Sequence, residues 1–173
     1  MIKHTLKAML SNLSNFIIMI FVAILAIPLC ALLKENGFII INGFLTTMAF
    51  MLLSYQTAWK AGWKDVNYLK IHNIKFTPLK GFLIPIIPYV FALVCFIIYK
   101  ITESGIAWIL FYGSTIYYSG FITLFPNAYP YAYLVAMLLT CAVTGTAYLL
   151  GYKRISLSVN IMYKKDKDED INK

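Results

Sequence analysis

The chain has 173 residues, of which 61% are hydrophobic and 13% are charged, and its formal net charge is +8. Soluble domains carry about 25% charged residues, so this composition argues against an ordinary soluble domain and is typical of a protein with several membrane spans. The basic residues flank apolar runs, which argues against nucleic-acid binding and favours contact with anionic lipid headgroups. Three cysteines, Cys30, Cys95 and Cys141, lie singly in apolar runs, so neither a disulfide framework nor a zinc site is expected.

The first predicted span is Phe16–Leu33, which follows a short segment containing Lys3 and Lys7. Its 18 uncharged residues make a helix of about 27 Å, close to the hydrocarbon thickness of about 30 Å. The run is longer than a usual signal core and no A-x-A-like site follows it, so we expect an uncleaved span. Pro28 predicts a kink near its outer end.

The second predicted span is Phe38–Ala58, and it contains the candidate intramembrane polar site, Asn42 and Thr46. A threonine can bond back to its own helix, whereas Asn42 needs a partner outside its helix if it faces the bundle. The modest strength of such bonds favours a packing role for Asn42 over a functional one.

A basic segment, residues 59–80, separates the second span from the third and carries five lysines against a single acid, Asp65. On a helix that continues from the span, residues four apart share a face. Tryptophan at headgroup depth with lysines reaching outward is the expected interface anchor, formed here by Trp59, Trp63, Lys60 and Lys64. We expect Asp65 to pair with Lys60 or Lys64 and to have no catalytic role.

The third predicted span, Gly81–Tyr99, contains Pro85 and Pro88 near its inner end. Prolines suit a first helical turn, which favours a tolerated pair, and a flexible point at the carbonyls they leave unbonded is the alternative. The next apolar stretch, Ser104–Phe125, is uncharged and long enough to cross the membrane. It is also rich in glycine, tyrosine and tryptophan, and aromatic side chains of this kind prefer the interface. An interfacial or re-entrant element and a fifth span therefore both remain open.

The last predicted span, Tyr131–Tyr152, carries small residues four apart, a spacing that lets another helix approach closely. The predicted helix-packing face, facing the rest of the chain or a partner, consists of Ala132, Ala136, Thr140, Thr144, Cys141 and Gly145. Alternating residues from Ile155 to Tyr163 predict a strand, with residues 71–76 as a weaker strand partner. Residues 1–163 are expected to form a single helical domain, followed by a disordered charged cytoplasmic tail, residues 164–173.

The distribution of lysine and arginine decides between the two threadings. With four spans and both termini inside, thirteen basic residues lie inside and two lie outside. With five spans, seven lie inside and eight outside. The positive-inside rule therefore favours an all-α bundle of four spans in the plasma membrane, with an outer interfacial or re-entrant aromatic segment and both termini cytoplasmic. Five spans is the alternative.

Two short motifs carry a resemblance to a protein family. They are Trp59-Lys-Ala-Gly-Trp-Lys-Asp65-Val-Asn67 after the second span, and Gly151-Tyr-Lys-Arg-Ile-Ser-Leu157 with Tyr163-Lys-Lys165 after the last. In these motifs and in its layout the chain resembles small uncharacterised multi-pass membrane proteins of Gram-positive bacteria. The resemblance implies a membrane protein and contributes no activity or site.

The residue types present bear on three kinds of function. A membrane enzyme needs a nucleophile with its base, paired acids or metal ligands, and no such motif is present, so we expect neither catalysis nor a cofactor. Transporters place ionisable residues inside spans, and this chain has none there. The sequence therefore favours a non-enzymatic accessory or assembly subunit that contacts other membrane subunits or a second copy of itself. The alternative is a transport component for a neutral or amphipathic substrate, in which Asn42, Thr46, Thr140 and Thr144 would line one cavity.

Overall fold

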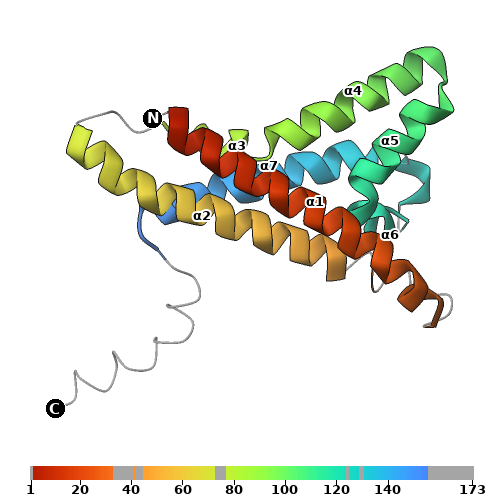
Figure 1. Ribbon diagram of the computed structural model, residues 1–173, viewed down its shortest axis with the longest axis horizontal. Coiled ribbons are helices and arrows are strands. Elements are labelled where there is room, and N and C mark those ends of the chain that lie inside the picture. Colours follow the sequence, from red (N-terminus) through yellow and green to blue (C-terminus); the bar gives the residue numbers. More distant parts are fainter. Residues whose placement is uncertain are drawn as a thin grey trace.

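The computed structural model describes residues 2–32, 41, 45–72, 77–123, 125–128 and 131–155, and in these ranges the regular structure is entirely helical (Figure 1). The elements are α1 (Ile2–Leu32), α2 (Thr46–His72), α3 (Lys80–Leu83), α4 (Ile86–Thr102), α5 (Gly105–Thr115), η3 (Ile116–Tyr118), α6 (Ser119–Ile122), η4 (Pro126–Ala128) and α7 (Ala132–Tyr152). The predicted all-α class is therefore confirmed. Asn42 and the charged tail lie outside the described residues.

The predicted strand pairing is not supported where the structure describes it. Ile71 and His72 form the last turn of α2, and Ile155 follows α7 without strand structure. The remaining residues of both predicted strands lie outside the described ranges. The helical period continues from the second predicted span through the lysine-rich segment, so propagation of an existing helix prevails over the short alternating pattern.

Helix α1 begins well before the first predicted span. It runs for 31 residues, from Ile2, and includes Pro28 inside the helix. Its length of about 46 Å exceeds a hydrocarbon thickness of about 30 Å, so its first turns extend beyond the apolar layer of any bilayer it crosses. The backbone of the basic amino-terminal segment is thus helical.

The third predicted span is broken into α3 and α4. Pro85 stands at the amino-terminal cap of α4 and Pro88 lies in its first turn. Proline has no backbone N–H to donate and fixes its φ angle, so it suits the start of a helix and interrupts one that precedes it. The break leaves α3 as a four-residue helix that packs against α7.

Helices α1 and α2 are antiparallel, whereas α2 and α7 lie side by side and run in the same direction (Figure 1). Two glycines permit this close approach. A Cβ atom placed on Gly62 would overlap the backbone oxygen of Tyr148, and one placed on Gly151 would overlap the backbone oxygen of Trp59. The amino terminus of α1 and the carboxyl termini of α2 and α7 therefore lie at one end of the bundle.

The stretch from α5 to η4, which follows α4, enters the bundle from one end, turns back and returns to the same end. Glu103 ends α4 in the left-handed region, with a φ of 52°, and α5 turns back along α4. The ring of Trp108 packs on Tyr99, whereas Tyr118 reaches as far as Tyr89 in the first turns of α4. Tyr131, just before α7, packs against Phe96 near the middle of α4 and lies beside the Lys100 ammonium near the carboxyl end of that helix. Tyr118 meets α7 at Thr140, and α7 continues about 18 Å beyond that level.

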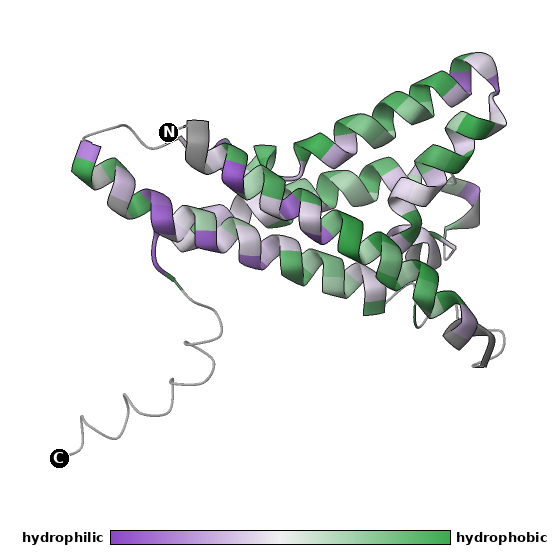
Figure 2. Cartoon of the chain, viewed as in Figure 1, coloured by the Kyte–Doolittle hydropathy of each residue, from purple (hydrophilic) through white to green (hydrophobic). Residues whose placement is uncertain are grey.

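Hydropathy separates the two parts of the bundle. Hydrophilic residues gather toward the end that holds the start of α1 and the end of α2, whereas the rest of α1 and α4 is hydrophobic (Figure 2). Among the described residues, two helical segments are long and apolar enough to cross a membrane, Thr5–Pro28 and Ala132–Tyr152, and Ile86–Thr102 is a shorter apolar helix. The part of the chain that the structure describes is thus helical and contains two candidate membrane-spanning helices.

The glycine contacts between α2 and α7 can be tested by adding a single methyl group. Gly62→Ala or Gly151→Ala should lower the free energy of unfolding by about 1–3 kcal/mol, because each new Cβ meets rigid backbone and forces the helices apart. The measurement is denaturant unfolding of the purified protein in a mild detergent, followed by circular dichroism.

Gly113→Ala is the matched control, because nothing lies within 4 Å of a Cβ built there. In the α5 helix this change should be neutral or should stabilise by up to about 1 kcal/mol. Equal stability of the Gly62, Gly151 and Gly113 variants would contradict the close helix approach.

Candidate functional site

A buried carboxylate joins three helices at the hydrophilic end of the bundle. The Lys80 ammonium of α3 lies 2.9 Å from Oδ2 of Asp65 on α2, and both side chains are less than 10% exposed. The Tyr148 hydroxyl of α7 donates to the same oxygen at 2.7 Å. Because Asp65 is buried together with its counter-charge and a hydroxyl donor, its negative charge is compensated within the protein.

This arrangement corrects the predicted partner of Asp65. Lys60 and Lys64 were expected to pair with it, but they stand five and one positions before it on the same helix. Only side chains three or four positions apart are neighbours on a helix surface. Asp65 therefore faces α3 and α7, whereas Lys60 and Lys64 are exposed on α2.

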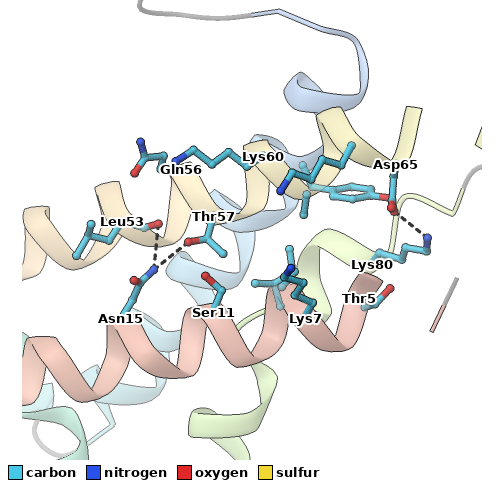
Figure 3. Close-up of a pocket in the computed structure, with 15 residues that line it drawn as sticks. Thr5, Lys7, Ser11, Asn15, Leu53, Gln56, Thr57, Lys60, Asp65 and Lys80 are labelled. Carbon is cyan, nitrogen blue, oxygen red and sulfur yellow. Dashed lines mark hydrogen bonds and ion pairs between the residues drawn. The ribbon is translucent and has the colours of Figure 1, made fainter. Parts of the chain in front are cut away.

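A polar pocket of about 280 Å³ lies beside this ion pair, between α1 and α2 (Figure 3). On α1, Lys7, Ser11 and Asn15 line it at a spacing of four residues. The full lining consists of Thr5, Lys7, Ala8, Ser11, Asn15, Leu53, Gln56, Thr57, Lys60, Ala61, Lys64, Asp65, Lys80, Ile84 and Tyr148. Residues spaced by four share one helix face, so two polar helix faces meet here.

The Asn15 amide ties the two helices together at the far side of the pocket from the ion pair. It donates to the Thr57 hydroxyl at 2.9 Å and to the Leu53 carbonyl at 3.4 Å (Figure 3). These bonds hold α1 against α2, and α1 beyond Asn15 packs its apolar residue Phe16 into the hydrophobic core. Asn15 therefore marks the boundary between the polar pocket and the apolar part of the bundle.

The pocket is strongly cationic. Four lysines line it against one carboxylate, and Lys80 is already paired with that carboxylate. For the remaining three, Lys7, Lys60 and Lys64, the structure gives no acidic partner among the residues it describes. Three ammonium groups and several neutral donors around one cavity favour an anion as its ligand.

The predicted interface-anchor tryptophans lie on a different side of α2 from the pocket lining. The Trp59 and Trp63 rings stack with 6.5 Å between their centroids and 12° between their planes. The Trp59 indole N–H donates to the Ile155 carbonyl at 2.8 Å, which ties α2 to the chain just after α7. Trp63 is 43% exposed. The four predicted anchor residues therefore lie in two places: the Trp59 and Trp63 indoles lie on the side of α7, and Lys60 and Lys64 line the pocket.

The candidate intramembrane threonine, Thr46, donates a hydrogen bond to the turn at η3. Thr46 and Thr47 both donate to the Tyr117 carbonyl, at 3.0 and 2.7 Å. A backbone carbonyl at a turn inside an apolar bundle needs such a donor, because lipid offers none. Asn42, predicted beside Thr46, lies outside the described residues.

The predicted packing face of α7 is mostly buried within the chain. Ala136, Thr140, Thr144 and Gly145 are buried, whereas Ala132 and Cys141 are partly buried. Thr140 donates to the Ala136 carbonyl, so its oxygen accepts from Tyr118, which in turn accepts from Tyr89. Thr46, Thr140 and Thr144 therefore take part in helix contacts and do not line the pocket.

Several pocket residues were missed by sequence reasoning. In the sequence, Lys80 stands out only as one of the basic residues that set the membrane orientation, and no pattern marks Tyr148 as a pocket residue. The spacing of Lys7, Ser11 and Asn15 matches that of Gln56, Lys60 and Lys64, and this pattern could have identified two facing polar stripes. Within the described ranges, no group of three or more His, Cys, Asp or Glu side chains is placed to hold a metal ion.

Comparison of the chain with protein-family models, curated proteins and solved structures found no match. The site must therefore be interpreted from its own geometry and charges.

The Asp65 carboxylate can be tested by charge removal. Asp65→Asn should lower the free energy of unfolding by about 3–5 kcal/mol, because Lys80 is then buried without its counter-charge. Asp65→Leu combined with Lys80→Met and Tyr148→Phe should unfold close to the wild type, because no buried polar group is left unpaired.

Denaturant unfolding in mild detergent measures both variants. A triple variant as unstable as Asp65→Asn would show that packing, and not charge compensation, sets the stability of this end. An Asp65→Asn variant as stable as the wild type would contradict the ion pair itself.

Proposed function

We propose that this protein is a non-enzymatic, multi-pass membrane protein of the plasma membrane that acts through binding and helix contacts, as an accessory or assembly subunit. The observation that carries the proposal is the division of its polar groups. Thr46, Thr140 and Tyr118, within the apolar part of the bundle, form internal hydrogen bonds, although the buried hydroxyl of Tyr117 has no partner among the described residues. Among the described residues, three lysines without an acidic partner, Lys7, Lys60 and Lys64, gather at one end of the bundle, whereas the charged residues Lys100 and Glu103 lie at the far end of α4.

The exposed surface supports a membrane location. Only 28% of the apolar window in Thr5–Pro28 and 44% of that in Ala132–Tyr152 is buried inside the protein. The core helix of a soluble protein would be buried to a much larger extent. The outward residues of α1 are large and apolar, including Ile18, Phe21 and Leu25. Apolar helix surface of this kind is stable against lipid and costly in water.

The direction of the helices supports four passes. Helices α1, α2, α3–α4 and α7 traverse the bundle, whereas the stretch from α5 to η4 turns back at the level of Thr140. This stretch fits a re-entrant element, because the irregular backbone at its turn is buried in protein and its carbonyl is satisfied by threonines. With the lysine-rich end placed in the cytoplasm, both termini are cytoplasmic.

The second candidate function, transport, is supported by fewer observations than the accessory role. It was expected to gain support if Asn42, Thr46, Thr140 and Thr144 lined one cavity. The three threonines are instead buried in helix contacts, and Asn42 lies outside the described residues. The pocket between α1 and α2 favours ligand binding at one end of the protein. The resemblance to multi-pass proteins of Gram-positive bacteria stays a prediction.

The threading can be tested with reporters on the carboxyl terminus. A fluorescent protein that folds only in the cytoplasm should be bright, and alkaline phosphatase at the same position should be inactive, because four passes return the chain to the side on which it began. An active phosphatase fusion would favour five passes and would overturn the proposed orientation.

The accessory role can be tested by the mass of the protein purified in mild detergent. Light scattering should give a mass above that of one chain, either as a homo-oligomer or with a defined partner in fixed ratio. Gly113→Ala adds a methyl group that meets no other atom of the protein, so this control should give the same mass as the wild type. Recovery of a single chain without any partner would contradict the accessory role.

A further inference from the structure

The pocket between α1 and α2 combines three features of an anion site. Its charge is unbalanced, because Lys7, Lys60 and Lys64 come from two different helices and surround a single cavity, while Asp65 is compensated by Lys80 and Tyr148. A carboxylate that is buried and already holds two donors offers little attraction to a cation. The site is therefore selective for negative charge.

The neutral residues of the pocket add hydrogen-bond donors. Ser11 and Gln56 line the cavity at its exposed side, and Asn15 and Thr57 lie beside them, bonded to each other. Hydroxyl and amide groups among ammonium groups suit an anion with several oxygen atoms, such as a phosphate, which can accept many hydrogen bonds at once. The volume of about 280 Å³ lies near the lower limit of ligand pockets, about 300 Å³, so it suits a headgroup and not a whole lipid.

The position of the pocket along α1 indicates where that phosphate comes from. The pocket-lining residues of α1 end at Asn15, and the exposed residues that continue the same helix face, Ile18, Val22 and Leu25, are large and apolar. A molecule whose phosphate lies among the lysines can therefore place an acyl chain along the apolar surface that follows. This sequence of polar and apolar surface matches the order of groups in a membrane lipid.

We propose that this pocket binds the headgroup phosphate of a net-anionic membrane lipid, with Lys7, Lys60 and Lys64 as the cationic ligands. The inference rests on the proposed function, because it requires the lysine-rich end of the bundle to lie at the headgroup layer. A free phosphate anion has the same charge and oxygen atoms, and it is the alternative source of the ligand that the experiment must separate.

The test uses native mass spectrometry of the full chain purified in a neutral detergent. The protein is titrated with phosphatidylglycerol, with phosphatidylcholine of the same acyl chains, and separately with inorganic phosphate. We expect one phosphatidylglycerol molecule to be retained more strongly than phosphatidylcholine, whose phosphate carries its own cation. Lys60→Gln should weaken retention about fivefold and Lys60→Gln with Lys64→Gln about thirtyfold.

Two further variants separate the pocket from general surface charge. Lys153→Gln removes the same charge at the same end of the bundle, where Lys153 is exposed and does not line the pocket. It should change retention less than twofold. Ser11→Trp fills the cavity without changing the charge and should weaken phosphatidylglycerol retention as strongly as the double lysine variant, while circular dichroism shows the helices intact.

Equal retention of the two lipids, or equal loss in Lys153→Gln and Lys60→Gln, would overturn the proposal. Retention of inorganic phosphate without retention of phosphatidylglycerol would overturn the lipid as its source. The carboxyl-terminal reporters test the proposed function separately. Loss of lipid selectivity with a cytoplasmic reporter removes this inference alone, whereas an external reporter removes the proposed orientation whatever the titration gives.

Discussion

The close approach of α2 to α7 is the constraint on which the rest of the structure depends. Gly62 and Gly151 bring the two backbones together without intervening side chains, which fixes the rotation of both helices. Given that rotation, Asp65 and Tyr148 face each other, and Lys80 from the short helix α3 completes the buried group. Because a buried carboxylate is stable only when its charge is compensated, this contact also fixes the position of α3.

The same rotation determines what α1 meets. With Asp65 turned toward α3 and α7, the side of α2 that carries Lys60 and Lys64 is left facing α1 and the surroundings. Lys7, Ser11 and Asn15 of α1 face the same side, and the Asn15 amide donates a hydrogen bond to the Thr57 hydroxyl. The cationic pocket is thus a consequence of placing the one acid of this region in the core, because the lysines on either side of it lose their only nearby counter-charge.

The sequence predicted the helical class, because long uncharged runs are a local signal, whereas the number of membrane spans stays a prediction. It predicted neither the break at Pro85, where a tolerated early proline was expected, nor the partner of Asp65. A pairing partner depends on which helix face is turned inward, and that rotation is set by distant residues such as Gly151. Lys7 and Lys60 were both noted as topology signals, yet their juxtaposition required knowing that α1 begins at Ile2 and lies antiparallel to α2.

The aromatic stretch after α4 shows why length and hydropathy do not decide whether a segment crosses. Residues 105–118 run along α4 as far as Tyr89, then turn where Thr46 and Thr47 satisfy the Tyr117 carbonyl. A continuous helix would have needed no such donors, because its carbonyls are bonded within the helix. The threonines of α2 and the hydroxyl of Thr140 therefore stabilise a turn in the middle of the bundle, where the chain reverses direction before α7.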